Sequence, residues 1–372
     1  MIKGIYSVYG KIKNRILEIS MKYKEKTIKE ILKLAEEHKE NPDKFIAEVE
    51  KSPAPKGWRG DIFLEVGRIL YDHSHNHLAM VSWEHALKYL KNKDIEKISE
   101  CCENLGLVNY KLRNYNKAID YYEKSLELFK KQRNKSGESA CYINLGCVYY
   151  DLDDFKKAVE FYEKALKIAL EIGNKTKESK CYLNLGFAYY HLENFNKAVE
   201  FYEGALKIIL EAGNKTDEFR CYLKLGDSYY YLNHLNKAVE FYEKASKIAL
   251  EAGNKTDESE CYINLGVAYY NLNQFKTAVE FYEKSLKIAL EISDKELEAR
   301  CDLKLGFAYF NSDDFTKASE FYMKAGNIFK ETGRMDGIEI VYKRMTDIYE
   351  KMKSREKTKR YKRKAEKINL KI

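Results

Sequence analysis

Six of the eight cysteines recur at intervals of 40 residues, which makes them the first candidates for disulfide or metal chemistry. Equivalent residues on stacked helices are expected about 8–10 Å apart, beyond the ~7 Å Cα separation that a disulfide allows. No Cys-x-x-Cys or Cys/His spacing suits zinc either. We therefore expect small buried apolar residues in a reducing compartment. The six are Cys101, Cys141, Cys181, Cys221, Cys261 and Cys301.

The histidine-rich stretch DHSHNH at 72–77, with His85 nearby, is the other candidate for chemistry. His73 and His77 can share a helix face and hold a metal, but the stretch falls where a hairpin turn is expected, so we predict a polar turn. No metal site and no cofactor are expected. The chain shows no P-loop, GxSxG or HExxH motif and no carboxylates clustered at a loop, so we predict that it is not an enzyme.

The surroundings of the cysteines repeat as well: CYINLGVAYY at 261–270 has near copies at 141–150 and 181–190. Within 138–177, two apolar stripes at helical spacing predict two helices, joined by a turn at Asp153 and Asp154. Gly173 and Asn174 are expected to end the second helix, and Thr176 to cap the next one. Each unit is therefore predicted to be a helical hairpin that completes its core by stacking on its neighbours.

A glycine and an alanine recur in every clear unit. A glycine in mid-helix costs about 1 kcal/mol relative to alanine, so a close approach of the two helices is the expected reason. In one unit these residues are Gly226 and Ala238. The glycines are Gly106, Gly146, Gly186, Gly226, Gly266 and Gly306.

The pattern Tyr142…Leu145-Gly146…Tyr149…Ala158…Tyr162…Ala165 resembles the tetratricopeptide repeat. The resemblance is strong over 97–332 and weaker at 58–92 and 336–370. At 40 residues the units are longer than the family's usual repeat, and are similar to those of Pins-type polarity scaffolds, kinesin light chains and Rap-type regulators. The resemblance implies an all-α, right-handed superhelical solenoid of about eight hairpins with an N-terminal helical segment.

This implies a division of the chain near residue 56. Residues 1–56 are expected to form a helical segment or cap, because Ile5, Val8, Ile12, Ile16 and Ile19 follow a helical period. Residues 57–372 are expected to form the repeat array. It comprises a degenerate repeat at 58–95, six clear repeats at 96–335 and a degenerate capping repeat at 336–372.

Four rows on the first helix of each unit vary: six and two residues before the recurring glycine, and one and five residues after it. The resemblance implies that they line an inner, concave surface that binds peptides. Their small excess of basic residues favours an acidic partner. Asn184 with Arg220 and Lys224 is similar to half of a carboxylate clamp whose other half is absent. The same holds for Asn264 with Arg300 and Lys304. The predicted groove residues are Asn144, Lys180, Asn184, Arg220, Lys224, Asn264, Arg300 and Lys304.

The predicted function is that of a protein-interaction scaffold or adaptor that binds a peptide or protein segment in this groove. A peptide-gated regulator of the Rap type is the alternative. A further possibility rests on residues 351–372, where eleven Lys or Arg face two Glu, so that this tail can contact nucleic acid or an anionic surface. No apolar run approaches the roughly 18 residues of a membrane span. The first twenty residues carry no secretory signal pattern, so a cytoplasmic location is expected.

Overall fold

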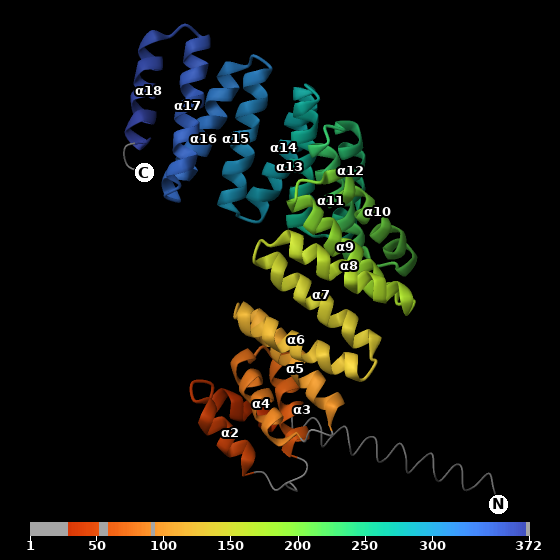
Figure 1. Cartoon of the computed structure of the whole chain (residues 1–372). Coiled ribbons are helices and arrows are strands. Elements are labelled where there is room, and N and C mark those ends of the chain that lie inside the picture. The colour runs from red at the N-terminus through yellow and green to blue at the C-terminus, as the bar shows by residue number, and fades with distance from the viewer. Residues whose placement is uncertain (1–28, 52–58, 91–93, 370–372) are drawn as a thin grey trace, which may run out of the picture. The chain divides into compact units, whose positions relative to one another are not determined.

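The computed structural model describes residues 29–51, 59–90 and 94–369, and these residues contain helices and turns but no strand. Figure 1 shows consecutive helices arranged as hairpins. The predicted all-α repeat solenoid is confirmed. Most of the N-terminal periodic pattern, from Ile5 to Ile19, lies outside the described residues, and the predicted division near residue 56 stays a prediction.

The chain forms two compact units, residues 1–181 and 182–372, and the boundary falls within helix α9. Residues 29–37 are helical. The helices that follow in the first unit are α2 (Pro42–Glu50), α3 (Arg59–Asp72), α4 (Asn76–Tyr89), α5 (Ile95–Lys111), α6 (Tyr115–Lys131), α7 (Lys135–Asp151) and α8 (Phe155–Glu171), and α9 spans Lys175–His191. The second unit continues with α10 (Phe195–Ala212), α11 (Lys215–Tyr231), α12 (Leu235–Ala252), α13 (Lys255–Asn271), α14 (Phe275–Glu291), α15 (Lys295–Asn311), α16 (Phe315–Glu331), α17 (Met335–Lys351) and α18 (Arg355–Asn369).

The turns are set by short polar residues. Asp153 adopts a left-handed conformation with φ of 58°, and the Asp154 carboxylate accepts a hydrogen bond from the Lys157 amide at 3.1 Å, so the predicted turn is confirmed. The predicted cap at Thr176 is wrong. Asn174 caps α9 by accepting from the Lys177 amide at 3.0 Å, because α9 already begins at residue 175 and Thr176 lies in its first turn.

The recurring glycine is required by a tyrosine of the second helix. A Cβ atom on Gly226 would stand 2.5 Å from Cε1 of Tyr242, well inside contact distance, and Tyr242 is itself buried. The ring lies flat against the glycine and fixes the distance between α11 and α12. The predicted close approach is therefore confirmed, and the same contact recurs at the other five glycines of the series.

The six periodic cysteines are fully buried free thiols, as predicted. The Cys301 thiol donates to the Ser285 hydroxyl at 3.2 Å, and burial raises the pKa of Cys141 to about 12. These thiols are protonated and pack as small apolar groups. At the start of the first unit, Ala35 and Phe45 share one core with Phe63 on α3.

The histidine-rich stretch forms the turn between α3 and α4, in which Ser74 has φ of 66°. The His73 Nδ1 atom lies 2.8 Å from the Ile69 carbonyl oxygen. In the ranges that the structure covers, no three His, Cys, Asp or Glu side chains gather as metal ligands would. Over those same ranges, no helix combines the length and apolar character needed to cross a membrane.

Candidate functional site

The predicted groove residues of the second unit lie on the first helices of successive hairpins. Asn184, Lys224, Asn264 and Lys304 are half-buried, whereas Arg220 and Arg300 are exposed. The helices α9 and α11 meet along this row, because the Lys224 ammonium group lies 5.7 Å from the ring centre of Tyr190. The second unit thus brings these side chains onto neighbouring helices. In the first unit, Asn144 on α7 is half-buried and Lys180 on α9 is exposed.

Two of the four predicted cations in the second unit are already neutralised by carboxylates of their own helix. Lys224 forms an ion pair with Asp227 at 2.7 Å, and the Tyr242 hydroxyl donates to the other oxygen of the same carboxylate at 3.0 Å. Arg220 approaches Asp217 at 3.4 Å. Sequence reasoning treated these cations as open to a partner, although the i, i+3 spacing of each pair is visible in the sequence.

The other two cations, Arg300 and Lys304 on α15, have no carboxylate within ion-pair distance among the described residues. The residue three positions after Lys304 is Phe307, where α11 carries Asp227. Burial lowers the pKa of Lys304, and the neighbouring charge of Arg300 lowers it further. An ammonium group held in this way favours an external anion, because no carboxylate among the described residues lies within ion-pair distance of it.

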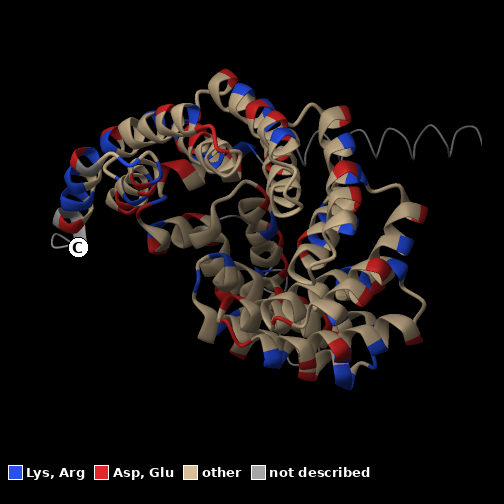
Figure 2. Cartoon of the chain, turned by 90° about the horizontal axis from the view of Figure 1, so that it is seen from above, with Lys and Arg blue, Asp and Glu red and all other residues tan. Residues whose placement is uncertain are grey.

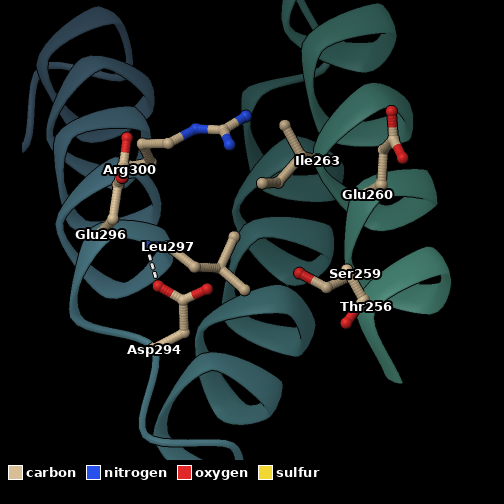
Figure 3. A pocket seen from close by; sticks show the side chains of 8 residues that line it. All are labelled: Thr256, Ser259, Glu260, Ile263, Asp294, Glu296, Leu297 and Arg300. Atoms are coloured by element: carbon tan, nitrogen blue, oxygen red, sulfur yellow. Dashed lines mark hydrogen bonds between the residues drawn. The ribbon is translucent and has the colours of Figure 1, made fainter. Parts of the chain in front are cut away.

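A cavity of about 420 Å³ adjoins Arg300 between α13 and α15. In Figure 3, Ile263 and Leu297 face each other across it, and the Arg300 guanidinium extends over it from α15. Burial raises the pKa of Glu260 on the opposite wall. The cavity thus combines an apolar floor with charged groups at its rim. It is lined by Thr256, Ser259, Glu260, Ile263, Asp294, Glu296, Leu297 and Arg300.

Another varying row, five residues after the recurring glycine, joins successive hairpins. The Asn271 amide donates to the Tyr230 hydroxyl at 3.1 Å, and the Asn311 amide donates to the Tyr270 hydroxyl at 2.6 Å. Sequence reasoning placed this row in the groove with the others. The tyrosine found four residues after five of the six glycines was the available signal, since it offers a hydroxyl to the next helix.

Comparisons with known proteins agree with this architecture. A family model described as tetratricopeptide repeat matches residues 99–171 and 179–251, and a second model of the same description matches residues 259–289. No curated protein matches the sequence.

Several solved structures are similar in fold. A signal transduction ATPase with numerous domains and a tetratricopeptide repeat sensor, from Pyrococcus horikoshii, gives a TM-score of 0.64 at 22% identity; the match covers 87% of this chain and half of that one. The apo form of the quorum sensor NprR from B. thuringiensis gives 0.60 at 16% identity, over 93% of this chain and 99% of that one. BtubC (BKLC) from P. vanneervenii gives 0.52 at 23% identity, over 59% and 92%.

Proposed function

Because this chain is a tetratricopeptide-repeat protein, we propose that it is an interaction scaffold that holds a segment of another protein along its first-helix row. The observation that carries this proposal is a set of polar side chains on that row that make no hydrogen bond or ion pair within the described part of the chain. They include the amides of Asn144 and Asn264 and the cations Arg300 and Lys304. Polar groups that lack such bonds favour binding, since a ligand can complete their hydrogen bonds.

The asparagine amides suit the main chain of a bound segment. Each amide offers both a donor and an acceptor, so it can pair with a main chain whatever the side chains of that main chain are. Asn144 lies on α7 and Asn264 on α13, and each occupies the same place in its hairpin. Such contacts give affinity through several weak bonds, and the cations Arg300 and Lys304 on α15 select among partners.

Removal of both amides tests the proposal. We expect Asn144→Ala together with Asn264→Ala to weaken partner binding by about 10- to 100-fold, the loss of one or two hydrogen bonds. The matched control is Lys164→Ala with Lys284→Ala, on the outer faces of α8 and α14, where these ammonium groups lie over the rings of Phe161 and Phe281 at 5.0 and 4.8 Å.

The measurement is capture of partners from the native cell, identification by mass spectrometry, and titration of the identified partner. Equal losses in the two double variants, or none in either, would show that the first-helix row is not the binding surface. Small-angle scattering with the same partner separates a constitutive scaffold from the alternative, a peptide-gated regulator, because only the regulator should become more compact on binding.

A second candidate function rests on α18. Lys359, Arg360, Lys362 and Arg363 are exposed and form no ion pair with described residues, and in Figure 2 blue predominates on the helix beside the C-terminus. Tyr361 packs against the ring of Tyr349 with ring centres 5.4 Å apart, so α18 also caps the stack. The outer face of such a cap can hold a polyanion through charge alone.

Neutralising the exposed basic side chains of α18 separates polyanion binding from capping of the stack better than removing the helix does. Glutamine at all four exposed positions should abolish any binding to duplex DNA or anionic vesicles and leave the melting temperature nearly unchanged, because none of the four is buried. In the unaltered protein that binding should fall steeply with salt. Binding that survives the four substitutions, measured by fluorescence anisotropy, would assign the polyanion to another surface.

A further inference from the structure

Three leucines of the second unit are exposed at the same place in successive hairpins. Leu210, Leu250 and Leu290 are 49, 58 and 55% exposed. Each stands in the last turn of the second helix of its hairpin, α10, α12 or α14, where the chain turns towards the next first helix. Single apolar side chains on a surface are ordinary, whereas apolar side chains that line one edge together mark an interaction surface. We call these three residues the leucine row.

The hairpin itself does not need leucine at this place. In α16 the equivalent residue is Lys330, which is exposed, and that hairpin closes on the contact of Gly306 with Tyr322 as the others close on theirs. Leucine and lysine have nearly equal helix propensities, so helix formation does not explain the choice either. The leucine row therefore adds apolar surface that a single copy of the chain leaves half in water.

The leucine row is bordered by charges of opposite sign on its two sides. A lysine stands three residues before each leucine, on the same helix face, and a glutamate follows each leucine directly. Glu291 approaches Lys255 at 4.0 Å, and the other five make no ion pair with described residues. The six are Lys207, Lys247, Lys287, Glu211, Glu251 and Glu291.

A surface of this kind is complementary to itself. A two-fold axis that runs along the leucine row places each leucine opposite its own counterpart in a second copy. The same axis lays the lysine side of each copy against the glutamate side of the other. An axis across the row would instead set lysine against lysine. Most homodimers are built by one patch that meets itself in this way.

We propose that the protein forms a two-fold dimer through the leucine row, with the second helices α10, α12 and α14 of the two copies antiparallel. This contact lies on second helices and does not involve the first-helix row, so it goes beyond the scaffold function. Three leucines and six charged residues are a small part of the about 20–30 residues per side of a standard interface. The dimer should therefore be reversible, with a dissociation constant in the micromolar range.

Removal of the leucines tests the contact. The triple variant Leu210→Ser, Leu250→Ser, Leu290→Ser should weaken self-association at least about tenfold, because it removes the apolar surface that the dimer buries. The matched control is Met352→Ser, which removes a side chain of similar exposure, 52%, from the opposite end of the hairpins, between α17 and α18. This control should leave association unchanged. The measurement is sedimentation velocity over a series from low to high micromolar protein.

Exchange of the bordering charges identifies the occupant as a second copy. Glutamate at all three lysine positions makes both sides of the leucine row acidic, and lysine at all three glutamate positions makes both sides basic. Each triple variant alone should lose self-association, whereas an equimolar mixture of the two should form a heterodimer, because the unlike edges attract. Added salt should weaken this heterodimer more than the unaltered dimer.

Circular dichroism establishes that each variant is folded. If the leucine variant is unfolded, the decision passes to the charge variants, whose six positions are all exposed. An unaltered protein that stays monomeric throughout the series would overturn the proposal. An undiminished dimer in the leucine variant, an equal loss in Met352→Ser, or a mixture of charge variants that forms no heterodimer would overturn it as well.

Discussion

Alanine at position 226 is expected to lower the free energy of unfolding by about 1–3 kcal/mol, the usual cost of overpacking a core. This is an unusual result for a helix interior, where alanine is ordinarily better than glycine by about 1 kcal/mol. The added Cβ would stand 2.5 Å from the Tyr242 ring. That ring cannot yield, because it is buried and its hydroxyl is bonded to Asp227. Leucine at the same position should cost more.

A second glycine in the same unit serves as the matched control. Gly204 lies inside α10, but a Cβ there would meet the Tyr182 ring at 3.6 Å, an ordinary contact. We expect Gly204→Ala to stabilise the protein by up to about 1 kcal/mol. Urea unfolding followed by circular dichroism should therefore move the midpoint in opposite directions for the two substitutions. A shift in the same direction for both would remove the role assigned to Tyr242.

Asparagine in place of Asp302 is expected to stabilise the protein by about 2–4 kcal/mol at pH 8 and to change little near pH 4. Asp302 occupies a place where Tyr222 and Tyr262 stand in other repeats. It is only 2% exposed and makes no hydrogen bond or ion pair with described residues. Lys324, Glu298 and Lys295 are the charged groups around it, but Lys324 is paired with Glu320 and Lys295 with Glu298.

The sign of this stability change follows from the raised pKa of Asp302. Burial raises the pKa of Asp302 from 3.8 to about 7, so the folded protein binds this proton more tightly than the unfolded chain does. The stabilisation is fully present below pH 3.8 and is lost as the pH rises through about 7. Three pH units correspond to about 4 kcal/mol, an upper bound. Asparagine resembles the protonated acid and should not titrate.

The measurement is urea unfolding of both proteins at several values between pH 4 and pH 8. All other titrating groups are shared, so the difference between the two curves isolates Asp302. We expect that difference to grow with pH and to level off above pH 7. Parallel curves would mean that the Asp302 carboxylate is solvated in the folded state. Asp302→Tyr, which restores the residue of the other repeats, should also lose the pH dependence.

The architecture was predictable because the repeats constrain one another. A helical period, a polar turn and an obligatory glycine recur at 40 residues, and each copy supports the interpretation of the others. Local capping was harder: Asn174 and Thr176 are both good caps, and only the helix start at Lys175 decides between them. The second-helix tyrosine that contacts the glycine was visible in the sequence as a recurring residue. Its contact with the glycine was not, because that contact depends on how the two helices pack.

The helix positions of the candidate site residues were predictable, but the ion pairing of each residue was predictable only in part. That these residues bind a partner stays a prediction. Periodicity places Lys224 and Lys304 at equivalent points, yet one is neutralised and the other is not. Attention to Asp227 and Phe307 would have shown this difference, because an ion pair at i, i+3 is a local feature. The cavity beside Arg300 was beyond sequence reasoning, since its volume depends on how Ile263 and Leu297 pack across two helices.

The repeated contact between glycine and tyrosine also bears on how this chain can change by descent. From Gly106 to Gly306, every hairpin closes on the same contact at the same spacing. Unequal crossing-over between two copies in the coding sequence would add or remove forty residues, or a multiple, and every junction in the product would be one that the chain already uses. The number of hairpins can therefore change during evolution without a new kind of junction. The same event can move or remove a repeat that carries a lysine without an ion-pair partner, as Lys304 is among the described residues.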